Sequence, residues 1–235
     1  MMRHLILMGL WMLPASRVKN RLLTAAGHRI DPRAVARSNL VWKVRSFEMA
    51  PHSRVHRWNV IKGMKVVRLG EHATIGKNNI ITASAAYEEL RDGGRLEIRE
   101  HGYVTSRHSM DCSGSLEVGA FSALAGFGSQ VLTHSIDLAR NAQTAYPIVI
   151  GERSFVGARC LLLGGSHLPS RSVLAAGSVL TDMKRTDEGL WAGVPARFKT
   201  TVTGRWFDRT EGATRLVYVR TAPAVPEEKR GAVSP

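Results

Sequence analysis

An aliphatic residue occupies every sixth position over a long stretch of the second half of the chain. The series consists of Ile150, Val156, Leu162, Leu168, Leu174 and Leu180. Four places after each of the first five stands a small residue, and these are Ser154, Cys160, Ser166, Ser172 and Ser178. Period six matches neither an α-helix nor a simple strand, whose periods are about 3.6 and 2 residues. The pattern therefore indicates a repeated structural unit.

A coil with a triangular cross-section accounts for this period. Each side is a short strand, each corner is a turn, and three hexads of roughly 18 residues close one coil. The aliphatic residue points into the narrow interior, and the small residue lies where the interior is tight. Successive coils pair through parallel ladders about 4.8 Å apart. We therefore expect an all-β, parallel β-helix over residues 30 to 199, with the six aliphatic residues of the series buried.

The same phase recurs upstream and is interrupted in two places. Further members of the series are Leu69, Ile75, Val118 and Leu124, and Met49, Val55 and Ile61 keep the spacing more loosely. Residues 86–94 are polar and rich in turn formers, and residues 133–147 break the phase a second time. Insertions in a repeat fold are loops that often carry function.

The two ends of the chain depart from the repeat. The apolar run Leu5 to Leu13 is too short for a bilayer span of about 20 residues, and an amphipathic pattern follows from Ser16 to Ala26. We interpret residues 1–29 as a short cap helix, and the alternative is an interfacial membrane anchor with basic flanks. Residues 200–235 form a C-terminal extension, of which the flexible tail from Thr221 to Pro235 is predicted to be disordered.

Charge and cysteine content limit the setting and the partners. Lys and Arg number 33 against 19 acidic residues, so the 235-residue chain carries a formal charge of +14 and attracts polyanions. The basic residues are spread along the chain, which argues against a specific nucleic-acid-binding arm. Cys112 and Cys160 make no disulfide framework. We expect a cytoplasmic protein, and weak contact with the inner face of the membrane remains open.

Four segments together resemble the bacterial hexapeptide-repeat acyltransferases. They are Ala125 to Leu138 (AGFGSQVLTHSIDL), Pro147 to Gly157 (PIVIGERSFVG), Ala175 to Thr181 (AAGSVLT) and Ala192 to Arg197 (AGVPAR). The chain looks similar to the sugar O-acetyltransferases of polysaccharide biosynthesis, relatives of the maltose and galactoside acetyltransferases. This resemblance implies a left-handed β-helix and a homotrimer with active sites between subunits. It also implies transfer of an acyl group, acetyl foremost, from acyl-CoA to a sugar or glycan hydroxyl without a metal.

His134 is the candidate general base. Acyl transfer from a thioester needs the acceptor hydroxyl to lose its proton, and a neutral imidazole accepts protons at cytosolic pH. The resemblance places this base at the mouth of an extended loop, here residues 133–147, where His134 stands. The alternative is a surface histidine in a loop. Asp137, three residues on, orients the imidazole, binds a sugar hydroxyl, or merely caps a turn.

A second polar cluster lies within an otherwise aliphatic tract. It contains His108 and Asp111, which we interpret as lining the acceptor pocket. The alternative is a turn whose polar groups satisfy one another.

The resemblance also assigns a coenzyme A surface. Ala158 and Ala176 match small residues that let the pantetheine arm approach, and Thr181 matches a threonine that contacts the nucleotide. Nearby cations for the phosphates are Lys184, Arg185 and Arg197. Many relatives have a lysine after the threonine, whereas this chain has Asp182. Lys184 and Arg185 alternatively belong to a solvated loop.

Three further functions fit parts of the pattern. Zinc-dependent γ-class carbonic anhydrases share this fold and bind zinc through three histidines. None of the nine histidines forms the His-x4-His ligand pair expected after the repeat, and His101 and His108 are seven apart. Repeat coils also serve as binding platforms, so a non-catalytic scaffold or a polyanion-binding protein would fit the sequence too.

Overall fold

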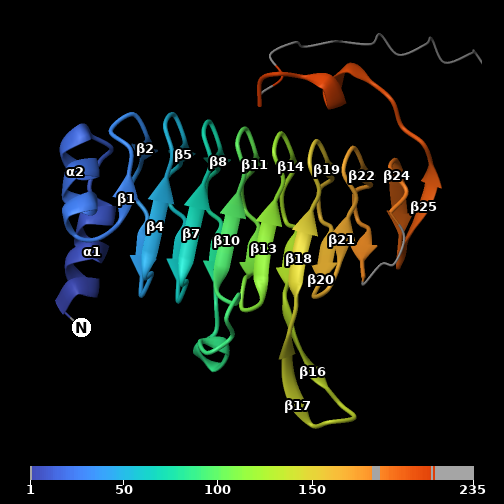
Figure 1. Ribbon diagram of the computed structural model, residues 1–235, viewed down its shortest axis with the longest axis horizontal. Coiled ribbons are helices and arrows are strands. Elements are labelled where there is room, and N and C mark those ends of the chain that lie inside the picture. Colours follow the sequence, from blue (N-terminus) through green and yellow to red (C-terminus); the bar gives the residue numbers. More distant parts are fainter. Residues whose placement is uncertain (1, 182–185, 213, 215–235) are drawn as a thin grey trace, which may run out of the picture.

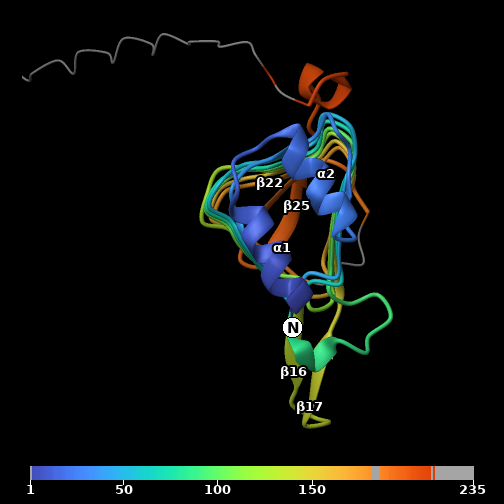
Figure 2. The same ribbon diagram turned by 90° about the vertical axis from the view of Figure 1, so that its left-hand side faces the viewer.

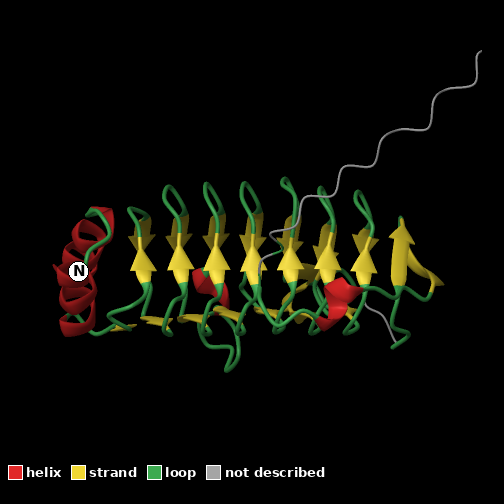
Figure 3. Ribbon diagram, turned by 90° about the horizontal axis from the view of Figure 1, so that it is seen from above, coloured by secondary structure: helices red, strands yellow, loops and turns green. Residues whose placement is uncertain are grey.

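The computed structural model describes residues 2–181, 186–212 and 214. Its short strands stack coil upon coil along one straight axis, and two helices close the N-terminal end (Figure 1). Seen along that axis, the coils superimpose in a three-sided outline (Figure 2). From above, the strands of successive coils lie side by side as rungs (Figure 3). This is the left-handed parallel β-helix of hexapeptide repeats expected from the sequence.

In the described residues each side of the prism is one sheet, and neighbouring coils pair in parallel. Sheet A consists of β1 (Arg29–Ile30), β4 (Ser46–Met49), β7 (Val66–Leu69), β10 (Arg95–Ile98), β13 (Ser115–Val118), β18 (Pro147–Ile150) and β21 (His167–Leu168). Sheet B consists of β2 (Val35–Ala36), β5 (Arg54–Val55), β8 (Thr74–Ile75), β11 (Tyr103–Val104), β14 (Ala123–Leu124), β19 (Phe155–Val156), β22 (Val173–Leu174), β24 (Leu190–Gly193) and the antiparallel β25 (Ala196–Thr200). Sheet C consists of β3 (Leu40–Trp42), β6 (Val60–Lys62), β9 (Ile80–Thr82), β12 (Ser109–Asp111), β15 (Gln130–Leu132), β20 (Leu161–Leu163) and β23 (Val179–Leu180).

The predicted inward track is confirmed. All six residues of the hexad series from Ile150 to Leu180 have no exposed surface. The predicted coil of roughly 18 residues holds near the C-terminus, where Phe155 pairs with Val173. The first coil is one residue longer, as in the pairing of Val35 with Arg54, and the next is two residues longer, as in the pairing of Arg54 with Thr74. Their sheet A strands bury two side chains, for example Val67 and Leu69, which explains the looser phase upstream.

Buried polar side chains connect the coils at the corner between sheets B and C. In each coil one of them accepts a hydrogen bond from the backbone N–H of its counterpart in the next coil. The chain of acceptors and donors runs through Asn39, Asn59, Asn79, His108, Ser129 and Cys160, with distances of 2.8–3.2 Å. These bonds satisfy backbone groups at turns that the sheets leave unpaired. Several of the polar positions therefore stabilise the stack as well as fitting the tight interior.

The N-terminal cap is two helices, where the sequence indicated one. Helix α1 spans Met2–Met12 and α2 spans Arg17–Ala25. Pro14 lies between them, and the Ser16 hydroxyl accepts from the backbone N–H of Lys19 at 3.0 Å to begin α2. Trp11 of α1 is fully buried and packs against Phe47 of β4.

The C-terminal extension runs back over the coils after β25 (Figure 1). It contains the short 3₁₀ helix η2 (Arg205–Asp208). Arg153 donates from Nη1 to the carbonyls of Phe207 and Arg209 at 2.7 and 3.0 Å, and the Gly212 N–H donates to His101. The predicted disordered tail, 221–235, lies outside the described residues.

Both interruptions of the repeat leave the prism at the corner between sheets C and A. The first, between β9 and β10, contains the 3₁₀ helix η1 (Ala85–Tyr87). The second, between β15 and β18, is an antiparallel hairpin of β16 (His134–Asp137) and β17 (Ala142–Ala145). Figures 1 and 2 show both on the same edge of the molecule.

Candidate active site

The first residue of the hairpin pairs with a carboxylate of the preceding coil. Nδ1 of His134 lies 2.8 Å from Oδ2 of Asp111, at the end of β12. The two residues are far apart in sequence, but β12 and β15 are adjacent strands of sheet C, with Asp111 opposite Leu132. Because Nδ1 faces the carboxylate, Nε2 is the ring nitrogen that remains for a substrate.

Asp111 is itself held rigidly by hydroxyl donors. The Ser113 hydroxyl donates to Oδ1 and the Thr133 hydroxyl donates to Oδ2, each at 2.6 Å. Burial raises the pKa of the carboxyl, but the hydrogen bonds from Ser113, Thr133 and His134 outweigh that effect and the pKa lies below its ordinary value. Asp111 therefore stays ionised near neutral pH and holds the proton of His134 on Nδ1.

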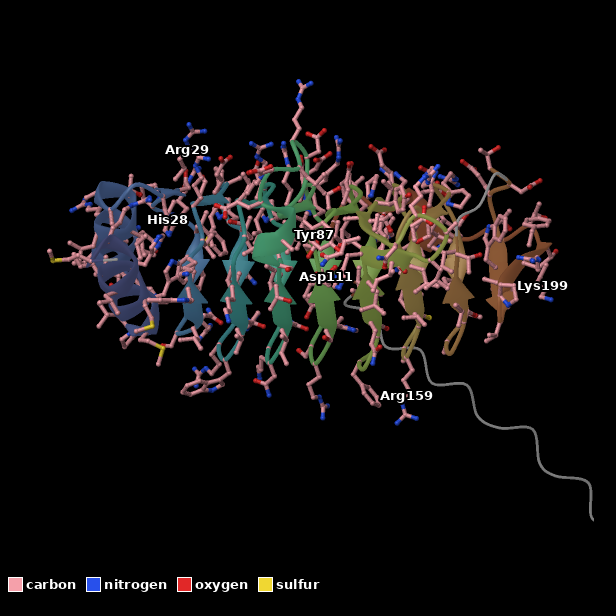
Figure 4. The ribbon with its side chains drawn as sticks, turned by 90° about the horizontal axis from the view of Figure 1, so that it is seen from below. His28, Arg29, Tyr87, Asp111, Arg159 and Lys199 are labelled. Atoms are coloured by element: carbon pink, nitrogen blue, oxygen red, sulfur yellow. The ribbon has the colours of Figure 1, made fainter. Side chains whose placement is uncertain are left out.

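The ring of Tyr87 lies beside the imidazole of His134. Tyr87 comes from η1 in the first insertion, is buried, and its ring centre lies 5.5 Å from that of His134. Figure 4 shows Tyr87 beside Asp111 on the same edge. Burial, with a smaller contribution from the charge of Asp111, raises the pKa of the phenol, which stays neutral. The two insertions thus meet at one site.

His134 lines a pocket of about 480 Å³ between the hairpin and the edges of the following coils. Its walls are Leu132, Thr133, His134, Ser135, Asp137, Thr144, Tyr146, Leu163, Gly164 and Thr181. Gly164 is required there, because any larger residue would place its Cβ 2.7 Å from the Thr133 carbonyl oxygen. The pocket therefore joins the candidate base to Thr181, which the sequence assigned to the coenzyme.

The structure separates the other predicted acceptor residues. Asp137 lines the pocket, but its carboxylate pairs with Arg140 at 2.8 Å, and His134 faces Asp111 instead. His108 is buried in the corner ladder: Nδ1 accepts from the Ser129 N–H at 3.2 Å, and Nε2 lies 2.7 Å from the Thr105 hydroxyl. Burial lowers the pKa of His108 to about 4, so its ring is neutral.

The described residues among those predicted for the coenzyme occupy three places, and one of them, Thr181, is in the His134 pocket. Ala158 and Ala176 follow one another along the corner between sheets B and C, and a Cβ on Gly126 of the preceding coil lies 2.5 Å from that of Ala158. Arg197 is exposed on β25 at the C-terminal end. Lys184 and Arg185 lie outside the described residues, as does Asp182. The alanine corner and the His134 pocket are thus on opposite edges of sheet C.

Sequence reasoning did not assign a role to Tyr87 or Thr133 at this site. One signal was present, namely that residues 86–94 and 133–147 are the places where the repeat breaks. Two insertions after the same side of a three-sided coil leave it at the same corner.

Neither a metal cluster nor a membrane-spanning helix occurs in the described ranges. Among residues 2–181, 186–212 and 214, no group of three or more His, Cys, Asp or Glu side chains is arranged to hold a metal ion. No helix in that part of the chain is both long and apolar enough to cross a bilayer.

Comparisons with known proteins agree with the architecture. A family model for the hexapeptide repeat of succinyl-transferase matches residues 147–182. No curated protein sequence matches the chain. Among solved structures, the polySia-specific acetyltransferase NeuO has 17% identity and a TM-score of 0.51, covering 82% of this chain and 82% of its own.

Two further structures are similar at lower scores. A hexapeptide transferase family protein from Anaplasma phagocytophilum has 20% identity and a TM-score of 0.49, covering 69% of this chain and 82% of its own. The acetyltransferase VCA0836 from Vibrio cholerae, complexed with acetyl coenzyme A, has 21% identity and a TM-score of 0.45, covering 57% and 70%. At such identities the likeness concerns the fold, and the reaction is inferred from the site.

Proposed function

We propose that this protein transfers an acyl group, acetyl foremost, from acyl-CoA to a hydroxyl of a sugar or glycan. The observation that carries the proposal is the Asp111–His134 pair at a pocket on the edge of the coils. A carboxylate on Nδ1 sets the imidazole tautomer in which Nε2 accepts a proton. This is the arrangement that general-base catalysis requires.

The reaction proceeds by direct transfer. Nε2 of His134 removes the proton of the acceptor hydroxyl as its oxygen attacks the thioester carbonyl carbon. The tetrahedral intermediate collapses when the carbon–sulfur bond breaks, and His134 returns the proton to the departing thiolate. Ester and free coenzyme A result. The charge of Asp111 stabilises the imidazolium that forms between these steps.

Sheet C is the proposed track of the coenzyme. Its strand β20 has three residues, or about 10 Å, between the corner of Ala158 and the pocket wall at Leu163. A pantetheine arm laid across β20 and β23 spans that width and brings its thioester to His134. In this placement Thr181 lies under the arm, whereas Lys184, Arg185 and Arg197 remain the candidates for its phosphates.

The proposal extends to a glycan acceptor and to a homotrimeric assembly. NeuO is named for its action on a polysialic acid, which supports a glycan acceptor here. A homotrimer supplies the second wall of the cleft. Exposed Leu40, Ile80 and Leu132 on the outer face of sheet C support burial of that face between subunits.

The test is a mass-spectrometric search for transfer from acetyl-CoA to a panel of sugars, nucleotide sugars and oligosaccharides. Release of free thiol is measured in parallel. We expect one or more acceptors to gain one acetyl group with wild-type protein and none with His134→Ala. Absence of product with bound acetyl-CoA and every acceptor favours the scaffold alternative. Equal product from wild type and His134→Ala contradicts the assignment of the base.

A further inference from the structure

Helix α1 is apolar on the side that faces the solvent as well as on the side that faces the coils. Its inner face buries Leu7 and Trp11. Its outer face exposes side chains at helical spacing: Met2 is 75% exposed, Leu5 48% and Ile6 54%. Met12 and Leu13 continue this stripe at the end of the helix. Ordinary surface helices are polar on the outer face, so this stripe requires an explanation.

The second helix extends the same surface. α1 packs on β3 and α2 packs on β1, so both outer faces turn away from the coils at the flat end of the prism (Figure 2). On α2 the inner face buries Asn20 and Leu23, while Val18 is 63% exposed and Leu22 is 44% exposed. We call the exposed apolar side chains of α1 and α2 the end face.

Basic side chains flank the end face, and acidic ones are missing from its sequence. Arg17 and Arg21 are exposed on α2 beside Val18 and Leu22. The first acidic residue of the chain is Asp31. The end face therefore combines aliphatic side chains with positive charge, the chemistry that recognises the interface of an anionic bilayer.

We propose that the end face docks on the surface of an anionic lipid membrane. Leu5, Ile6 and their neighbours enter the headgroup region, and Arg17 and Arg21 contact lipid phosphates. α1 has 11 residues, or about 16 Å, so it lies on the bilayer and does not cross it. A second copy of the chain fits the end face less well, because contact between two end faces would bring their like charges together. The proposal does not depend on acyl transfer.

The experiment is co-sedimentation of the full chain with vesicles. One set is phosphatidylcholine alone and the other contains about 30% phosphatidylglycerol. The apolar variant is Leu5→Gln with Ile6→Gln, both exposed and hence without a core cavity. Its matched control is Trp58→Gln, because Trp58 is 60% exposed but lies on a coil corner. Circular dichroism checks that each variant is folded.

A second pair of variants separates local from overall charge. Arg17→Gln with Arg21→Gln removes two charges from the cap, and Arg54→Gln with Arg57→Gln removes two from the coils, so the net charge is the same. We expect binding to anionic vesicles to fall about tenfold or more in the apolar variant, and about 30-fold in the cap charge pair. Trp58→Gln and the coil pair are expected to bind within about threefold of wild type.

Two outcomes overturn the proposal. Equal loss from both charge pairs, with no effect of the apolar variant, means that a basic protein is attracted without using the end face. Concentration-dependent association in lipid-free sedimentation velocity, lost in the apolar variant, means that a second copy covers this surface. Loss of vesicle binding confined to the two cap variants supports docking.

Discussion

Replacing His134 by alanine is expected to remove acyl transfer while leaving the fold intact. The side chain is 43% exposed on β16 and lies off the inward track, so its removal leaves no core cavity. Asp111 keeps its donors Ser113 and Thr133 when the imidazole is lost. We expect the free energy of unfolding to change by less than about 1 kcal/mol, the ordinary range for a partly exposed polar pair.

The catalytic loss is expected to be much larger. A general base contributes about 10²–10⁴ in rate, equal to about 3–5 kcal/mol of the barrier. The assay is thiol release from saturating acetyl-CoA, with coenzyme affinity measured by calorimetry and stability by differential scanning calorimetry. Coenzyme affinity should be retained, because the proposed track lies on β20 and β23.

A matched pair of carboxylate variants tests the orienting role. Asp111→Asn removes the charge beside His134. Asp137→Asn removes a charge that lines the His134 pocket and pairs with Arg140. We expect Asp111→Asn to lower kcat about 100-fold or more and Asp137→Asn to remain within about tenfold. Activity of His134→Ala within about tenfold of wild type, or equal losses in the two asparagine variants, refutes the assignment.

The remaining predictions concern stability, the ring beside His134 and assembly. His108→Ala should lower the free energy of unfolding by about 2–4 kcal/mol in urea titrations, because it removes a ladder member and leaves the Ser129 N–H unpaired; an unchanged midpoint contradicts this role. Burial lowers the pKa values of His28 and His108 to about 4, so the unfolded chain binds more protons between pH 6.5 and 4. Stability should therefore fall as pH drops through that window, and the fall should be smaller in His108→Gln. Tyr87→Ala should lower kcat about tenfold or more while Tyr87→Phe stays near wild type, since the ring of Tyr87, with its centre 5.5 Å from that of His134, is kept in phenylalanine; similar kcat values for the two variants contradict this. Light scattering should give a homotrimer, and a monomer at micromolar concentration would count against an intersubunit cleft.

The repeat itself is determined by local sequence. A side chain every sixth residue meets the same environment in every coil, so one aliphatic pattern is enough to identify the inward track from Ile150 to Leu180. The position of His134 could also be predicted, because it stands where the repeat breaks. The resemblance of its flanking motif then indicated its chemistry.

Which residues meet across coils was decided only by the tertiary structure. Contact between coils depends on the number of residues in each coil, and that number changes along the chain from 20 to 18. The same corner position holds Asn79, His108 and Ser129, so His108 belongs to the structural ladder although its neighbours in sequence resemble a site. Asp111 reaches His134, and Tyr87 reaches it from a different insertion, because stacking brings their edges together. The period is set by local sequence, whereas the partners of His134 depend on the register between coils.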